Sequence, residues 1–402
     1  MRRDKLYKKY AKHPKHTYEL SETMSVTDDE GRTPDIVFLY SGRERGKSFE
    51  VACQCIMDAW YDDKTFMYVR RHKATNFQIE SYFGDKFDFI HDMTDGAADG
   101  ICCYQSQLFL YKDIEDENGK RKRERVKRVG YFIPLAAQGS HKSEHFPDCY
   151  NLLYEEVLTI DEPYLSGEPE RLYNLISTVG RSREGFKIYL ISNLVSYVNP
   201  YSKAWGLDFS RAKPGEITLT KLYLQVYDDN GEERYFLVAG HYLKDKNQLT
   251  KEDTQKKRNR IKAGSDNRWQ EARLYTTIDL SFIREYTPLE TVVFEWDDVM
   301  MQGDLLELPT NVRDVYLYGE EPNEQTMPVL YVRKKTSEPF NMTRVYSNNS
   351  ERFNEYTSRG FKKIYKIDLI IEQIMLRGWF MGADNLTMNA FDTIWKKLRL
   401  FN

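Results

Sequence analysis

A short basic loop between an apolar run and a helix-like segment constrains this chain more than any other feature. The loop follows the apolar residues 36–40 and precedes the segment 49–60, which has the composition of a helix. Its sequence is Ser41-Gly42-Arg43-Glu44-Arg45-Gly46-Lys47-Ser48. A buried strand, a tight loop ending in Gly-Lys-Ser and a helix are the setting of a phosphate-binding loop, because backbone N–H groups and the positive helix end can hold phosphate oxygens.

Two side chains of this loop have predictable roles toward ATP and Mg²⁺, the cofactors that we expect. Lys47 would neutralise phosphate charge that grows in the transition state, and the Ser48 hydroxyl would hold Mg²⁺. The spacing departs from the usual pattern, because Ser41 stands where the first glycine is expected and Gly42 follows one step later. The alternative is a chance Gly-Lys-Ser in a basic turn, and the flanking strand and helix argue against it.

Length and composition limit the class of protein. A chain of 402 residues can bury two hydrophobic cores, and 30% charged with 14% aromatic residues is typical of a soluble globular protein. The net charge of -3 means that any contact with nucleic acid must come from local basic patches. The five cysteines lack the spacing of a zinc site or a disulfide framework, and they fit a reducing cytoplasm. No apolar run reaches the length of a membrane span, so no membrane contact is expected.

Strand-like and helix-like runs alternate through the first half, which predicts a mostly parallel α/β sheet in three layers. The expected strands are 65–71, 107–112, 130–135, 151–154 and 187–192, with 107–112 and 130–135 forming a hairpin around a charged tip at 115–128. A second hairpin is expected over 217–238, with its turn at 228–231.

The pattern changes toward the C-terminus, where a polar, helix-prone stretch precedes a second set of strands. The stretch is 250–273, the strands are 291–296, 314–318 and 329–332, and helices are expected at 366–379 and 389–400. We therefore expect an N-terminal extension (1–34), a P-loop domain (35–235), a linker or lid (236–285) and a smaller α+β domain (286–402).

Two adjacent acids end the apolar strand 151–154. Since side chains alternate along a strand, Glu155 can face Mg²⁺ through water while Glu156 activates the water that attacks the γ-phosphate. Most such motifs have Asp in the first position, and Glu155 lengthens the reach by one methylene. The alternative is an acidic strand end in solvent.

Three further sets of polar residues are candidates for the same chemistry. Asn193, at the end of the strand 187–192, can sense the γ-phosphate, or it can simply cap the strand. Arg181 and Arg183 suit a finger that enters a neighbouring subunit's site and contributes about 10³–10⁵ in rate, although a surface pair is the simpler reading. Two basic clusters are candidates for DNA contact, with solvated loops as the alternative: Lys120, Arg121, Lys122 and Arg123, and Lys256, Lys257 and Arg258.

Several segments together resemble one family, the DNA-packaging (encapsidation) ATPases of small tailed phages that replicate by protein priming. The matching segments are 41–48, 66–73, 133–147, 153–157, 177–184 and 192–201, in the family's order. The pieces Tyr68-Val69-Arg70-Arg71 and 192–201 are far more specific than a phosphate loop. The tail after Asn311 is similar only loosely.

The resemblance implies a ring ATPase, expected to be a pentamer, that sits on the portal of an empty capsid and drives double-stranded DNA inward. It leaves open whether a structural RNA joins the motor. It also implies roles for single residues: nucleotide binding by Lys47 and Ser48, Mg²⁺ binding by Glu155, water activation by Glu156, a trans-acting finger at Arg181 with Arg183 close behind, an intersubunit role for Lys142, and coupling of the γ-phosphate to the catalytic glutamate by Asn193.

The family's second domain resembles the RNase H-like nuclease of large terminases, without cutting activity. A two-metal nuclease would need several converging carboxylates, and Asp297, Asp298 and Asp314 do not form a convincing set. Two alternatives to a packaging motor stay open: another nucleic-acid-stimulated P-loop translocase of the HerA/FtsK type, and a DNA- or portal-binding scaffold that does not hydrolyse ATP.

Overall fold

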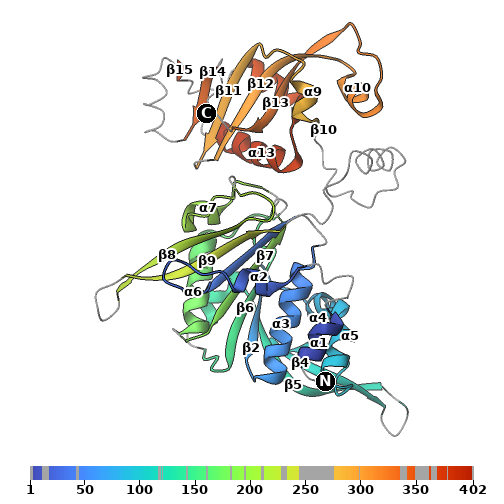
Figure 1. The fold of residues 1–402 in the computed structure, drawn as a ribbon, viewed down its shortest axis with the longest axis vertical. Helices are drawn as coiled ribbons and strands as arrows, with labels where there is room; N and C mark the ends of the chain where they lie inside the picture. The colour runs from blue at the N-terminus through green and yellow to red at the C-terminus, as the bar shows by residue number, and fades with distance from the viewer. Residues whose placement is uncertain are drawn as a thin grey trace. The chain divides into compact units, whose positions relative to one another are not determined.

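The chain folds into two compact units, Met1–Leu194 with Ala204–Lys246, and Val195–Lys203 with Asn247–Asn402. Figure 1 shows the computed structural model. It describes residues 3–10, 18–41, 45–115, 119, 121–141, 144–159, 162–181, 183–193, 196–209, 212–227, 233–243, 276–297, 299–335, 342–348, 362–363, 369–377 and 379–400. No helix in these ranges is both long and apolar enough to span a membrane.

A nine-stranded sheet in the order β3-β4-β5-β2-β6-β7-β1-β9-β8 forms the centre of the first unit. The run from β5 through β2, β6, β7 and β1 to β9 is parallel, which confirms the predicted mostly parallel sheet. Antiparallel pairs extend both edges, β3-β4-β5 on one side and β8-β9 on the other. The strands are β1 Ile36–Ser41, β2 Thr65–Arg70, β3 Gly100–Tyr104, β4 Gln107–Glu115, β5 Arg121–Pro134, β6 Cys149–Glu155, β7 Lys187–Asn193, β8 Ile217–Tyr227 and β9 Glu233–Tyr242.

Alternate residues of β1 pack on opposite faces of this sheet, as a strand buried on both sides requires. Val37 and Leu39 join the hydrophobic cluster of α3 and α5, while Phe38 and Tyr40 make edge contacts with Phe209. The helical segments of the unit are α1 Arg3–Tyr10, α2 Leu20–Met24, α3 Lys47–Tyr61, α4 Asn76–Phe83, η1 Gly84–Lys86, α5 Phe87–Met93, η2 Leu135–His141, α6 Glu168–Gly180 and α7 Pro200–Trp205.

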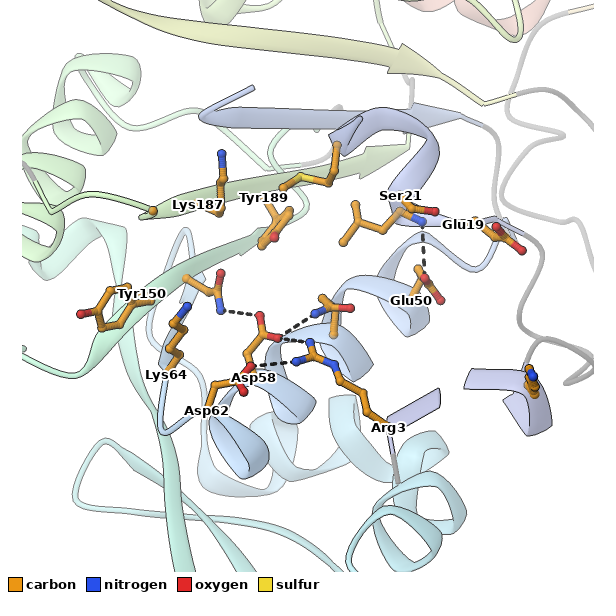
Figure 2. A pocket seen from close by; sticks show the side chains of 16 residues that line it. Arg3, Glu19, Ser21, Glu50, Asp58, Asp62, Lys64, Tyr150, Lys187 and Tyr189 are labelled. Atoms are coloured by element: carbon orange, nitrogen blue, oxygen red, sulfur yellow. Dashed lines mark hydrogen bonds and ion pairs between the residues drawn. The ribbon is translucent and has the colours of Figure 1, made fainter. Parts of the chain in front are cut away.

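The N-terminal extension packs along α3, and the Leu20 backbone N–H donates to Glu50 in the first turn at 3.4 Å. Arg3 pairs with Asp58 at 2.5 Å and with Asp62 at 2.7 Å, as Figure 2 shows. A cavity of 640 Å³ lies between the extension, the side of α3 that carries Glu50, Gln54 and Asp58, and the first residues of β6 and β7. Burial raises the pKa of Asp58, and the Arg3 guanidinium opposes that rise. This cavity therefore extends along α3 from Glu50, in the first turn, to Asp62, just beyond the last residue.

The charged residues 121–128, predicted as part of a hairpin tip, instead belong to the strand β5. β4 and β5 pair antiparallel as far as Glu115 opposite Arg121, and β3, which the sequence did not predict, pairs with β4. Asp113 stands opposite Arg123 in the same ladder. Opposite charges facing each other across a pair of strands stabilise it, so this segment extends as a ribbon despite its polarity.

A second, seven-stranded sheet in the order β10-β16-β13-β12-β11-β14-β15 forms the other unit. β11, β12 and β13 are an antiparallel meander, while β14 runs parallel to β11 and β16 runs parallel to β13. Helix α13 packs its apolar side chains on this sheet, including Phe391 against Phe294. The elements are β10 Thr276–Thr277, α9 Leu280–Ile283, β11 Glu290–Trp296, β12 Val299–Pro309, α10 Val312–Tyr318, β13 Thr326–Lys334, β14 Met342–Ser347, β15 Lys362–Lys363, α12 Leu369–Leu376, β16 Phe380–Gly382 and α13 Asn385–Leu400.

One predicted strand of this unit is wrong. Residues 314–318 belong to the helix α10, which ends at Gly319 with φ 69°. A glycine in this left-handed conformation terminates helices, because its missing Cβ removes the steric penalty. Val312 and Tyr316, one helical turn apart, both pack in the cluster beneath α10. The polar stretch 250–273 and the turn 228–231 lie outside the described residues.

Candidate active site

The phosphate loop connects the carboxyl end of β1 to the first turn of α3. Gly46, with φ 68°, is the N-cap of α3, and Lys47 is its first residue. The buried Lys47 Nζ donates to Ser41 Oγ at 2.6 Å. Ser41, the residue in place of the usual first glycine, therefore contacts the lysine of the motif. Gly42, Arg43 and Glu44 lie outside the described residues.

The two residues predicted to hold Mg²⁺ are in contact. Glu155 is buried at the end of β6, and its carboxylate forms a hydrogen bond with the Ser48 side chain. Burial raises the pKa of Glu155, while hydrogen bonds from Ser48 and Tyr82 act in the opposite direction. A hydroxyl and a carboxylate beside the first turn of a phosphate-loop helix are oxygen ligands of the kind Mg²⁺ takes, so these residues fit that ion.

Glu156 points away from Glu155 and into solvent. Its side chain is 62% exposed and forms an ion pair with Arg70 at the end of β2. Its backbone has φ 58°, a left-handed conformation that is uncommon outside glycine. A cavity of 470 Å³ opens here, bounded by both glutamates, Arg70, Tyr82 and Phe77. Glu155 is thus buried and Glu156 exposed although both line the same cavity, and Glu156 lies just beyond the end of β6.

Arg71 forms hydrogen bonds that fix the backbone around Glu156. Its guanidinium donates to both carboxylate oxygens of Glu168, at 2.7 and 2.9 Å, and both side chains are buried. It also donates to the backbone oxygens of Val157 at 2.8 Å and Glu156 at 3.3 Å. The Tyr154 hydroxyl adds a bond of 3.0 Å to Glu168. This network fixes the backbone immediately after β6.

The two candidate finger arginines differ in their surroundings. Arg181 is exposed beyond the end of α6, with φ 44°, and donates to the backbone oxygen of Glu144 at 2.9 Å. Arg183 turns inward, donates to the backbone oxygen of Phe146 at 2.9 Å and lies 4.9 Å from the Tyr150 ring centroid. Lys142 lies outside the described residues.

Asn193 ends β7 directly beside Ser41, its register partner at the end of β1. It therefore lies at the carboxyl edge of the sheet that also carries the loop and the acid pair. The side chain that bonds to the Glu156 carboxylate, however, is Arg70 on β2.

The basic residues of β5 divide into paired and exposed groups. Arg123 donates to Glu80 at 2.9 Å and lies 4.4 Å from the Tyr111 ring centroid. Arg121 and Lys122 are exposed. Lys120 and the cluster Lys256, Lys257 and Arg258 lie outside the described residues.

Sequence reasoning missed the partners of the two glutamates. In the sequence, Arg70 and Arg71 stand out only as part of a segment that resembles the family. No sequence pattern indicates a functional role for Tyr82. Tyr82 donates to Glu155 at 2.8 Å across a separation of 73 residues. Nothing in the local pattern around residue 82 indicates a polar partner, since it reads as one more aromatic residue of an amphipathic helix.

The acids of the second unit do not gather into a metal site within the described ranges. Asp297 accepts from the Asn348 amide at 2.9 Å, and Asp314 lies in α10. The buried Asp304 is neutralised by Arg333 at 3.0 Å. Asp298 lies outside the described residues.

Comparisons with known proteins match the part of the chain that carries this site. Residues 32–213 match the family model of the podovirus DNA encapsidation protein (Gp16). The DNA packaging protein of Bacillus phage B103 is 27% identical over 172 residues, 42% of this chain and 47% of the relative. That of Bacillus phage phi29 is 28% identical over 166 residues, 41% of this chain and 44% of the relative. The chain thus spans less than half the length of the curated relatives that it matches.

Solved structures of packaging motors are also similar to this chain. The N-terminal domain of the DNA packaging ATPase from bacteriophage phi29 is 23% identical, with a TM-score of 0.39, and covers 54% of this chain and 93% of its own. The Phi-29 viral genome packaging motor assembly is 16% identical, with a TM-score of 0.46, and covers 95% of this chain and 99% of its own.

Proposed function

Residues 32–213 make this chain a relative of the podovirus DNA encapsidation proteins (Gp16), and on that premise we propose that it is an ATP-driven motor that moves double-stranded viral DNA into a preformed capsid through the portal. The observation that carries the proposal is the meeting of Ser48, Glu155 and Glu156 at the carboxyl edge of one parallel sheet. Ligands of parallel α/β sheets bind at that edge.

The strand order supports an ASCE-type P-loop fold. β7 stands between β1, which leads into the phosphate loop, and β6, which ends in the acid pair. The additional strand separates the two nucleotide motifs as that class requires. Asn193, on the intervening strand, would then lie next to the γ-phosphate of bound ATP and couple its state to the site.

The chemistry follows from the residues at this edge. Lys47 would meet the charge of the β- and γ-phosphates, and Ser48 with Glu155 would hold Mg²⁺, directly or through water. When bound, Mg²⁺ supplies positive charge that stabilises the transferring phosphoryl group. Glu156, exposed on the cavity side, would orient the attacking water and take its proton. The ion pair between Arg70 and Glu156 has to open before that transfer, because the Arg70 guanidinium holds a carboxylate oxygen that would accept the proton.

A ring of subunits would complete the site, and a pentamer is the expected form. The exposed Arg181 is free of carboxylates among the described residues and can reach a neighbour, whereas Arg183 is used within its own subunit. We therefore assign the trans-acting finger to Arg181. Lys142, to which the family resemblance gives an intersubunit role, is also proposed to act between subunits. Portal binding belongs to the same proposal, and a structural RNA is left open.

For the second unit we propose an RNase H-like domain without nuclease activity, over residues 286–402, after a linker or lid that begins beyond β9 and not at 236 as expected. The meander β11-β12-β13 with β14 parallel to β11 supports that class of sheet. The pairing of Asp304 with Arg333 supports the loss of cutting activity, because a metal site needs free carboxylates. The P-loop domain is proposed to begin at residue 35, after the extension 1–34, and to continue past the expected boundary at 235 to the end of β9, because β9 pairs with β1.

The first test is steady-state ATPase activity with and without linear double-stranded DNA. We expect DNA-stimulated turnover in the wild type and its loss in Lys47→Ala, which removes the cation that meets the phosphates. A second measurement, DNA uptake, should require proheads; uptake without them would favour the HerA/FtsK-type translocase. Bound nucleotide with no turnover, even with proheads and DNA, would favour the non-hydrolysing scaffold.

A second prediction concerns DNA grip by the exposed pair Arg121 and Lys122. Each charge that meets a phosphate contributes about 0.9 to the slope of log K against log salt. We expect Arg121→Gln/Lys122→Gln to flatten that slope by about 1 to 2 and to weaken binding of all sequences equally. The matched control is Lys213→Gln/Arg234→Gln, which removes the same charge from exposed positions elsewhere on the first unit. Equal slopes in the two double variants would exclude β5 as a DNA contact.

A further inference from the structure

We infer that Tyr82 is a positioning residue that holds the Glu155 carboxylate in place for the metal side of the nucleotide site. The inference rests on the proposed function, since it assigns Tyr82 a role in a site that binds nucleotide with Mg²⁺. Tyr82 lies on α4, outside the loop and the strand ends that carry the recognised motifs.

The Tyr82 hydroxyl connects both sides of this site. It lies 2.8 Å from Glu155 Oε1 and 3.4 Å from the backbone oxygen of Ser48. A hydroxyl has one proton to give, so the shorter contact with the carboxylate is the hydrogen bond that matters. Because Ser48 bonds to the same carboxylate, Glu155 is restrained from two directions.

The ring of Tyr82 is itself fixed by its neighbours. It stacks on Tyr68 with centroids 4.7 Å apart and meets Phe83 edge-on at 4.8 Å. The Lys86 ammonium lies 4.5 Å from the ring centroid and donates to the Tyr82 backbone oxygen at 2.9 Å. Stacking and cation–π contact of this kind hold a ring in one orientation. The hydroxyl is thus a preorganised donor and not a mobile one.

The length of the Glu155 side chain explains why the Tyr82 hydroxyl is needed as a fixed donor. Glutamate has one more rotatable bond than the aspartate usually found at this position, so its carboxylate has more conformations to lose when it holds a metal through water. A fixed donor removes that freedom before the metal binds. Groups that orient a ligand in this way typically contribute about 10–100-fold to metal affinity or activity.

The test removes only the hydroxyl, with Tyr82→Phe, and reads binding as well as turnover. In the first measurement, a fluorescent ATP analogue is titrated into the full chain in the presence of EDTA. In the second, without EDTA, Mn²⁺ binding to the analogue-loaded protein is followed by electron paramagnetic resonance. We expect unchanged analogue affinity in EDTA and about tenfold weaker Mn²⁺ binding in the variant. The control is Tyr131→Phe, which deletes another tyrosine–carboxylate bond of 2.8 Å, to Asp148 at the start of β6.

A second variant separates positioning from a general loss of packing. In a Glu155→Asp background the shorter side chain cannot reach the Tyr82 hydroxyl in the same way. Tyr82→Phe should then change Mn²⁺ affinity by less than about twofold, which is non-additivity of the kind that residues in contact show.

The outcomes distinguish this inference from the proposed function. Equal Mn²⁺ affinity in wild type and Tyr82→Phe, with metal-dependent nucleotide binding intact, overturns the positioning role alone. An equal loss in both glutamate and aspartate backgrounds also overturns it, since the hydroxyl would then act by another route. A wild type that binds neither analogue nor Mn²⁺ overturns both the inference and the nucleotide site.

Discussion

Replacing Glu156 with glutamine is expected to lower the ATP turnover number by about 10²–10⁴-fold, the usual contribution of a positioned general base. Glutamine keeps the size and the hydrogen-bonding reach of the side chain and loses only the ability to take a proton. Because Glu156 is exposed and is not among the groups that hold phosphate or metal, affinity for the fluorescent ATP analogue should stay within about threefold.

The control for this variant is Glu162→Gln, which changes a neighbouring carboxylate of the same cavity. Glu162 pairs with Arg71 at 3.1 Å and with His72 at 3.3 Å, and its removal should leave turnover within a few-fold of wild type. Single-turnover kinetics with DNA and proheads measure both variants. Turnover in Glu156→Gln equal to that of Glu162→Gln would remove the general base from the proposed mechanism.

Local sequence patterns were enough to predict the elements that position this site. The apolar runs of β1, β6 and β7 are buried on both faces, and such runs read as strands whatever their neighbours are. Gly46 and Lys47 predict where α3 begins, because a phosphate-binding loop ends in this pair and leads into a helix. These signals come from residues that are neighbours in the sequence. Burial of the strands requires apolar residues, and the turn before α3 requires glycine, so the local pattern and the fold agree.

Elements and contacts that depend on distant partners could not be predicted in the same way. The polar ribbon of β4 and β5 exists because each strand supplies the other's counter-charges, for example Asp113 opposite Arg123. The bonds from Arg70 to Glu156 and from Arg71 to Glu168 join residues 86 and 97 positions apart. Such pairings follow from strand order, so a reading of the chain alone identifies the acids but not what holds them.

The largest effect on stability is expected from Arg71→Ala. Arg71 and Glu168 have side chains only 2% and 0% exposed, and removing one partner of a buried ion pair typically costs about 3–5 kcal/mol because the other charge stays buried. Glu168 would still accept from the Tyr154 hydroxyl at 3.0 Å and the Leu165 backbone N–H at 2.9 Å, but it would lose the Arg71 guanidinium. Urea unfolding of the full chain, followed by circular dichroism, should show a correspondingly lower midpoint for the first unit.

Arg70→Ala is the matched control for this prediction, since it removes the adjacent arginine from a half-exposed ion pair whose expected contribution is about 0–1 kcal/mol. Arg71→Met/Glu168→Leu should regain much of the stability lost in Arg71→Ala, because the double variant leaves no uncompensated charge. Turnover should not return with it, since the bonds from Arg71 to the backbone of Glu156 and Val157 are gone. Stability equal to wild type in Arg71→Ala would mean that Glu168 is satisfied without its partner. Full turnover in the stable double variant would mean that Glu156 keeps its left-handed backbone without Arg71, and the network would then serve the fold alone.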